Sequence, residues 1–350
     1  MMRIYIAPIL CMSFFSHIVY GKEILKILSW HGYTDTDIVS IFENKNNIDI
    51  EVTYVNNDKQ LREKLDDRNQ DYDLVALNSS ELQRYIKLRK FIPINISKIE
   101  NSKWISNQFA PLSTNPEITF NGNIYGLPYT YSSMGIIYNA DRVKSAPTSW
   151  QDFWSPEYHH KTLGYDGGTH NVSLAALALE LPDPFKIPKS DDELIAKKLI
   201  SLRENTLTFY RSLEEATELF NRFELSIMFA NFGHQQVDSL KKTGANIEYT
   251  IPKEGALAWL DCWSILSTSK QTELAHRWID FVLEPWVQLE LTKRHGLQSP
   301  LNQFSKSGNK EKLIWLSPVE SPEKREAMWD SVYSGKPLPK VMEHTKRARQ

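Results

Sequence analysis

EILKILSWHGYTDTDIVSIFENKNNIDIEVTYV, residues 23–55, decides the fold class, because a helical pattern stands between two strand patterns. Residues 23–30 are rich in isoleucine and leucine, which is typical of a buried strand. Ile38 and Phe42 have helical spacing, and residues 48–55 alternate between apolar and polar side chains as a strand does. The stretch therefore predicts a strand, a helix and a second strand.

The same alternation continues through the next segments of the chain. Residues 59–68 form a charged amphipathic pattern, residues 71–80 (DYDLVALNSS) an apolar strand with a polar end, and residues 80–91 another helical pattern. A β-α-β-α-β-α order predicts an α/β fold with a parallel sheet and helices on its faces. Ligands on such sheets bind beyond the carboxyl ends of the strands, which here carry residues 30–33 and 78–80.

The composition is that of a globular chain with room for two domains. The 350 residues are 41% hydrophobic, and the formal net charge is -2 at pH 7. Nucleic-acid surfaces need a basic stripe, so this charge balance argues against a nucleic-acid partner.

Residues 1–21 read as a separate targeting segment. A short basic start, MMR, precedes an apolar run that ends at VYG, an order that is typical of a secretory signal peptide. The alternative is a membrane anchor, but the apolar run is short and contains Pro8. Cys11 follows Leu10 rather than a small residue, so we expect no lipoprotein anchor. The mature chain should therefore be periplasmic.

Neither a metal site nor an enzyme is indicated. Without residues 1–21 only Cys262 remains, and no Cys/His spacing matches a metal site, so we expect no metal and no cofactor. The sequence has no lysine-bearing Gly-rich phosphate loop and no G-x-S-x-G motif. Asp166 and His170 could pose as a catalytic pair, but no motif supplies a nucleophile.

A series of motifs, taken in order, is similar to a known family. The motifs are LSWHGY (28–33), DYDLVALNSS (71–80), GLPYTYSSMGIIYN (126–139), TSWQDFWSPEYH (148–159), IPKEGALAWLDCWSIL (251–266), WIDFVLEP (278–285) and HGLQSPLN (295–302). Together they resemble the bacterial extracellular solute-binding proteins of the spermidine/putrescine-binding type, which are associated with ABC transporters. The resemblance extends from about residue 24 to about residue 303, and TSWQDFWSPEY and AWLD are its most specific parts.

The resemblance implies a two-lobed periplasmic-binding-protein fold of type II, the Venus-flytrap fold, with a hinge and a ligand in the cleft. Lobe 1 would comprise residues 22–131 and 259–303. Lobe 2 would comprise residues 132–258 and 304–350. The protein would be a monomer that binds a polyamine or a related small organic amine.

Several cleft positions match the family pattern. A polyamine needs carboxylates for its ammonium groups and aromatic faces for its methylenes and cations. Trp30 and Tyr33 match the aromatic pair after the first strand, and Trp259 and Asp261 match the family's W-x-D pair. Asp261 would hold one ammonium while Trp259 packs on the adjoining methylenes. Asp166 stands near one of the family's tandem acids.

Other positions depart from that pattern. Gly32 and His170 replace acids, and Asn78 and Ser80 replace a serine and a tyrosine. Ala230 replaces a tryptophan and Leu297 a tyrosine, whereas Tyr131 is a further candidate because it lies at the expected crossover between lobes. Since a triamine needs about three acids and this cleft keeps one or two, we expect spermidine binding to be weakened or lost.

The partner stays open at this level. The resemblance implies delivery of the amine to a membrane permease, but some members of the family report polyamines to a membrane signalling protein of the cyclic-di-GMP type. A non-polyamine amine or a zwitterion is also compatible with the cleft, as is a scaffold that has lost its ligand. The residues of the cleft do not separate these alternatives.

Overall fold

The computed structural model describes residues 22–67, 69, 71–304 and 312–348. The predicted signal peptide, residues 1–21, lies outside this part of the chain. Over the described ranges, every helix is too short or too polar to cross a membrane.

The first sheet is built mainly from the amino-terminal part of the chain. Its strands follow the order β13-β12-β3-β1-β2, and β6 also pairs with β12. These strands are β1 (Ile24–Trp30), β2 (Asp49–Val55), β3 (Leu74–Asn78), β6 (Leu127–Met134), β12 (Ala256–Ile265) and β13 (Leu313–Trp315). β1 is parallel to both β2 and β3, which confirms the predicted parallel arrangement.

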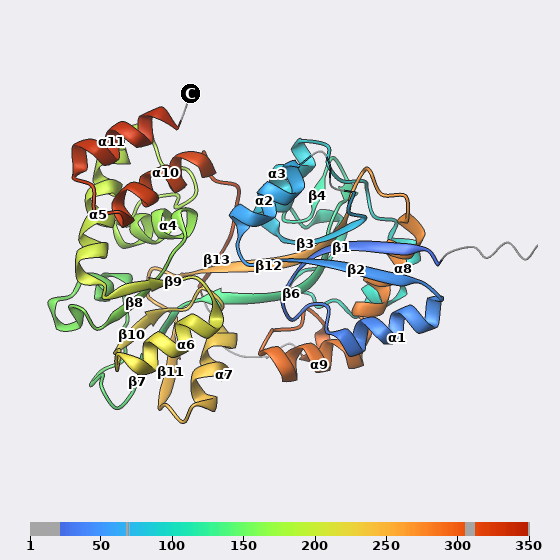
Figure 1. Cartoon of the computed structure of the whole chain (residues 1–350), viewed down its shortest axis with the longest axis horizontal. Coiled ribbons are helices and arrows are strands. Elements are labelled where there is room, and N and C mark those ends of the chain that lie inside the picture. Colours follow the sequence, from blue (N-terminus) through green and yellow to red (C-terminus); the bar gives the residue numbers. More distant parts are fainter. Residues whose placement is uncertain (1–21, 68, 70, 305–311, 349–350) are drawn as a thin grey trace, which may run out of the picture.

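Helices alternate with the first strands as the sequence predicts. They are α1 (Thr36–Asn46), α2 (Asp58–Asp66) and α3 (Ser79–Lys87), and α8 (Thr272–Val282) and α9 (Pro285–His295) join the same lobe later in the chain (Figure 1). A small hairpin, β4 (Thr119–Phe120) with β5 (Asn123–Ile124), completes it. The predicted β-α-β-α-β-α order is therefore confirmed.

A second sheet forms the other lobe. Its strand order is β11-β7-β10-β8-β9, with β7 (Ile136–Asn139), β8 (Thr162–Tyr165), β9 (Thr208–Tyr210), β10 (Ile227–Phe229) and β11 (Ile247–Thr250). The helices of this lobe are α4 (Gly168–Ala178), α5 (Asp192–Asn205), α6 (Leu213–Arg222) and α7 (His234–Lys242). The carboxyl-terminal helices α10 (Pro322–Tyr333) and α11 (Leu338–Arg347) lie with α4 and α5 (Figure 1).

A buried arginine fixes the carboxyl-terminal helices to this second lobe. Arg325 is fully buried, and its guanidinium donates to Ser173 Oγ at 2.8 Å and to the Pro184 carbonyl at 3.0 Å. It also forms an ion pair with Glu320 at 2.7 Å, which compensates its buried charge. These contacts make α10 part of the second lobe.

Two long strands carry the chain between the lobes. β6 and β12 pair antiparallel from Leu257 opposite Met134 to Trp263 opposite Leu127. β7 of the second sheet begins at Ile136, directly after β6, so the chain changes lobes there (Figure 1). The boundaries predicted at residues 131 and 259 fall inside β6 and β12, and they stay a prediction.

Candidate functional site

A cavity of about 360 Å³ lies where the carboxyl ends of β1, β2 and β3 face the second lobe. It brings together six of the nine residues proposed from sequence: Trp30, Tyr33, Asn78, His170, Trp259 and Asp261. Trp30 and Asn78 are the last residues of their strands. The cavity thus occupies the position that the strand order predicts for a ligand.

Asp261 is the buried acid of this cavity. It lies in β12 opposite Asn78 of β3, and it is 6% exposed. Tyr33 donates its hydroxyl to Asp261 Oδ2 at 2.6 Å. Burial raises the pKa of Asp261 to about 7, against the opposing effect of the Tyr33 hydrogen bond, and Asp58 raises the pKa further. Within the described residues, Asp261 forms no ion pair.

Aromatic side chains surround this acid. Trp259 is two residues before Asp261 on the same strand, so both side chains project from the same face of the sheet. Trp259 Nε1 donates to the Asn231 carbonyl at 3.2 Å, which joins β12 to the second lobe. Tyr33 packs edge-on against Tyr129, with ring centroids 5.2 Å apart. Trp30 also lines the cavity, and its Nε1 has no hydrogen-bond partner in the described structure.

Asp58 is a second acid of the cavity that the sequence reading missed. It is the first residue of α2, three residues after β2 ends. Asn78 Nδ2 donates to Asp58 Oδ1 at 2.9 Å, while Asn78 Oδ1 caps α3 by accepting from the Glu81 amide. Burial raises the pKa of Asp58, and Arg62 opposes that rise. The carboxyl-end rule that singled out residues 30–33 and 78–80 also applies to Asp58.

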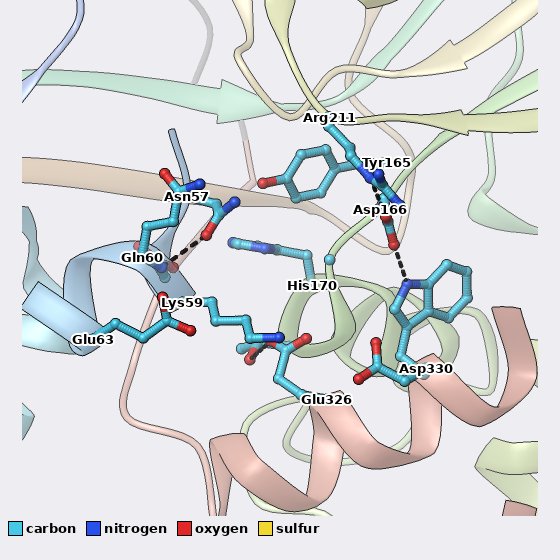
Figure 2. A pocket seen from close by; sticks show the side chains of 14 residues that line it. Asn57, Lys59, Gln60, Glu63, Tyr165, Asp166, His170, Arg211, Glu326 and Asp330 are labelled. Atoms are coloured by element: carbon cyan, nitrogen blue, oxygen red, sulfur yellow. Dashed lines mark hydrogen bonds and ion pairs between the residues drawn. The ribbon is translucent and has the colours of Figure 1, made fainter. Parts of the chain in front are cut away.

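A second cavity, of about 440 Å³, is drawn in Figure 2 and shares lining residues with the first. The two cavities share Asn57, Asp58, Tyr165, His170 and Arg211. Figure 2 shows His170 between the start of α2 and the second lobe. The cleft therefore consists of an aromatic chamber that continues into a polar one.

Asp166 lies in the polar chamber with both carboxylate oxygens engaged. Arg211 Nε donates to Oδ2 at 2.7 Å, and the indole nitrogen of Trp329 donates to Oδ1 at 2.7 Å (Figure 2). Trp329 belongs to α10 and is buried. This acid is therefore neutralised by the protein itself and ties the carboxyl-terminal helix to β8 and β9.

His170 enters the cleft as a neutral side chain. Burial lowers the pKa of His170 to about 4, and the positive charges of Arg62 and Arg325 act in the same direction. Its ring lies edge-on to Tyr165, with centroids 5.7 Å apart. At neutral pH the side chain can exchange hydrogen bonds with a ligand without repelling a cation.

Two of the proposed residues do not line either cavity. Ser80 lies in the first turn of α3 and is half-buried. Tyr131 lies in β6 and packs against Phe109 and Trp315, at centroid distances of 5.1 and 6.1 Å. Asn78, two residues before Ser80, does line the first cavity.

The glycine that replaces a family acid has a steric reason to be there. Gly32 has φ +84°, and a Cβ at this position would lie 3.0 Å from His295 Nδ1. His295 is held in place because its Nε2 contacts Asp35 at 2.9 Å. A side chain at position 32 would therefore require His295 to shift slightly and would hold a strained backbone conformation.

Other chemistry receives no support from the described residues. Within those ranges, His, Cys, Asp and Glu side chains form no group of three or more that could hold a metal ion. Cys262 is buried and free. Ala230 and Leu297 are both buried outside the cavity lining, whereas Asn231 and Phe232 contribute to it.

Comparisons with known proteins identify the family of the chain. Residues 37–311 match the family model described as bacterial extracellular solute-binding protein. The putrescine-binding periplasmic protein PotF of Escherichia coli is 26% identical over 279 residues, which cover 75% of this chain and 74% of that protein. The putrescine-binding periplasmic protein SpuD of Pseudomonas aeruginosa is 25% identical over 286 residues, or 77% of this chain and 76% of the relative.

Solved structures show the same fold. A putative spermidine/putrescine ABC transporter protein from Listeria monocytogenes superposes with a TM-score of 0.73 at 19% identity, covering 94% of this chain and 99% of that one. The substrate-binding protein PotD from Streptococcus pneumoniae gives a TM-score of 0.69 at 20% identity, covering 94% and 100%. The predicted two-lobed α/β fold is thereby confirmed.

Proposed function

The chain belongs to the bacterial extracellular solute-binding proteins, and we propose that it captures a small organic amine of the putrescine/spermidine class between its lobes. The observation that carries this proposal is Asp261, a buried carboxylate without a cation partner in the described structure, in a cavity lined by Trp30 and Trp259. A positively charged ligand supplies the charge that this site lacks.

The energetics favour a cation over a neutral ligand. An ionised carboxylate that is buried without a partner costs several kcal/mol, and an ammonium group removes most of that cost while forming a charge-assisted hydrogen bond. The faces of Trp30 and Trp259 suit the methylene chain and the cation itself. Relatives that are named putrescine-binding periplasmic proteins support the same ligand class.

The contact set of the proposal follows the cavity rather than the whole sequence pattern. Trp30, Tyr33, Asn78, Trp259 and Asp261 line the aromatic chamber, and His170 lines both chambers. Asp166 is left out because Arg211 and Trp329 already occupy its oxygens. Ser80 and Tyr131 are left out because they line neither cavity.

The amine would close the lobes about β6 and β12, as hinged binding proteins do. The closed form would then deliver the ligand to the membrane permease of an ABC transporter. In this role the protein is a periplasmic, monomeric carrier without enzymatic activity, and residues 1–21 serve as its secretion signal. A signalling receptor would use the same cavity, and no separate observation favours it.

Thermal unfolding of the chain from Lys22 onward tests the ligand class. The panel contains putrescine, cadaverine, spermidine, choline and a zwitterionic amino acid. A ligand at about a hundred times its dissociation constant adds roughly 2.7 kcal/mol of stability, which gives a measurable rise in melting temperature. We expect an amine to give this rise and Asp261→Asn to remove it. A panel in which only the zwitterion raises the melting temperature would contradict the proposal.

A further inference from the structure

We infer that Asp58 is a second carboxylate anchor of the cleft, so that the preferred ligand carries two ammonium groups, one held at Asp261 and the other at Asp58. This inference rests on the proposed function and makes it more specific. It assigns the ligand a number of charges and a direction along the cleft.

Asn78 joins the two carboxylates in space. Asn78 lies directly opposite Asp261 in the pairing of β3 with β12. Its side-chain amide donates to Asp58 Oδ1 at 2.9 Å. Cross-strand neighbours have Cα atoms about 4.5–5.5 Å apart, so the two acids flank one asparagine. Of the two chambers, Asp261 lines only the aromatic one, whereas Asp58 lines both.

Both anchors lack the cation that Asp166 of the same cleft possesses. Asp166 pairs with Arg211 at 2.7 Å. Asp58 and Asp261 form no ion pair among the described residues.

The nearest guanidinium does not change this. Arg62 pairs with Glu81 at 2.8 Å and approaches Glu326 at 3.8 Å, so it affects Asp58 only from beyond ion-pair distance. Among the described residues, Asp58 Oδ1 accepts a hydrogen bond from the neutral amide of Asn78. The acid at the start of α2 is therefore left to a ligand.

The side-chain amide oxygen of Asn231, on the second lobe, also lacks a hydrogen-bond donor in the described structure. Asn231 is 8% exposed and lines the aromatic chamber. Its backbone carbonyl is fixed by Trp259, which places the residue beside the W-x-D pair. An ammonium group has three donors, and an uncharged oxygen suits one of them.

Among the described residues, the region that both cavities share contains no carboxylate of the second lobe. Arg211 and the neutral His170 line its side of the shared region, and Asp166 is already paired. A triamine would have to reach Glu214, Glu326 or Asp330, which line the cavities outside that shared region, for its third cation. A monoamine would leave Asp58 without a partner. A linear diamine satisfies both anchors.

Titration calorimetry with a matched pair of ligands separates the two anchors. Putrescine carries two ammonium groups on four carbons, and butylamine carries one on the same chain length. We expect Asp58→Asn to weaken putrescine binding roughly ten- to hundredfold and to leave butylamine within about twofold. Asp261→Asn should weaken both ligands.

Two further variants keep the test specific. Glu63 is an exposed acid of the same helix that lines only the polar chamber. Glu63→Gln should therefore leave the affinities for putrescine and butylamine within about twofold. Asp58→Glu retains the charge on a longer side chain, so it should retain diamine binding and shift the preference toward 1,3-diaminopropane.

The outcomes distinguish this inference from the function on which it rests. Loss of binding in Asp261→Asn with wild-type putrescine affinity in Asp58→Asn would overturn the second anchor and leave the amine-binding function standing. Equal losses of putrescine and butylamine in Asp58→Asn would also overturn it, because they would indicate a structural role for Asp58. Failure of the wild-type protein to bind any amine would overturn both.

Discussion

The two walls of the cleft carry similar acids and use them differently. On the wall of the first sheet, Asp58 and Asp261 have hydrogen bonds from neutral side chains and no cation within the described structure. On the wall of the second lobe, Asp166 is neutralised by Arg211 and bonded by Trp329. The acids available to a ligand therefore cannot be counted from their positions in the sequence. What counts is which acids the protein leaves unpaired.

The largest expected effect is a pH dependence that belongs to the first wall. The pKa of Asp261 is raised to about 7, whereas an aspartate in the unfolded chain titrates near 3.9. The folded protein therefore holds an extra proton between these values, and this group lowers the stability of the ligand-free protein as the pH rises through that range.

Amine binding should show the opposite trend, because the ligand needs the ionised carboxylate. The affinity for putrescine should rise about a hundredfold between about pH 5 and about pH 8, measured by calorimetry. His170, with its pKa of about 4, stays neutral across this range and adds little. Asp261→Asn is the control and should give a much shallower profile, with the remaining slope due to Asp58, whose pKa is also raised by burial. A flat profile in the wild-type protein would contradict the role of Asp261 as the carboxylate that binds the amine.

The next effect concerns the paired acid of the second wall. Asp166→Ala leaves the buried indole nitrogen of Trp329 without an acceptor, so the free energy of unfolding should fall by about 1–3 kcal/mol in chemical denaturation. The affinity for putrescine should change less than about threefold. Asp330→Ala, at an exposed acid of the same chamber, is the matched control and should change neither quantity. Strongly weakened putrescine binding in Asp166→Ala would contradict this prediction, because it would show that the ligand contacts the second wall at Asp166.

The smallest effect tests whether the acid missing from the first wall can be restored. Gly32→Asp should lower the free energy of unfolding by about 1–2 kcal/mol, because position 32 has a positive φ and a Cβ there approaches His295. We expect no gain in spermidine affinity. Gly244→Asp shares the positive φ but meets no neighbour within 4 Å, so it should be less destabilising. A gain in spermidine affinity at unchanged stability would show that the cleft can be converted to a triamine site.

The sequence was sufficient for the order of the first strands and helices, because their hydrophobic periods are regular and their boundaries polar. It also predicted the chamber of Trp30, Tyr33, Trp259 and Asp261, which the structure brings together. These residues are close because the carboxyl ends of neighbouring strands meet at one edge of a sheet.

The remaining features depend on contacts that local patterns do not encode. The partners of Asp166 lie 45 and 163 residues away in the chain, so its neutralisation is a product of tertiary packing. In the sequence, Asp58 is one of many charged residues of a helix that is expected to face solvent. Only the tertiary fold brings it beside Asn78. Tyr131 packs against Trp315 from the carboxyl-terminal part of the chain and does not line the cleft.

The central claim is that Asp261 is a carboxylate which the protein leaves unpaired for an amine. The most direct measurement is titration calorimetry of putrescine with the wild-type protein and with Asp261→Asn at about pH 8, where the carboxylate is ionised. The account predicts one bound putrescine per wild-type chain and an affinity at least about a hundredfold lower in the variant. Equal affinities in the two proteins would contradict it, because the ligand would then be held by groups other than Asp261.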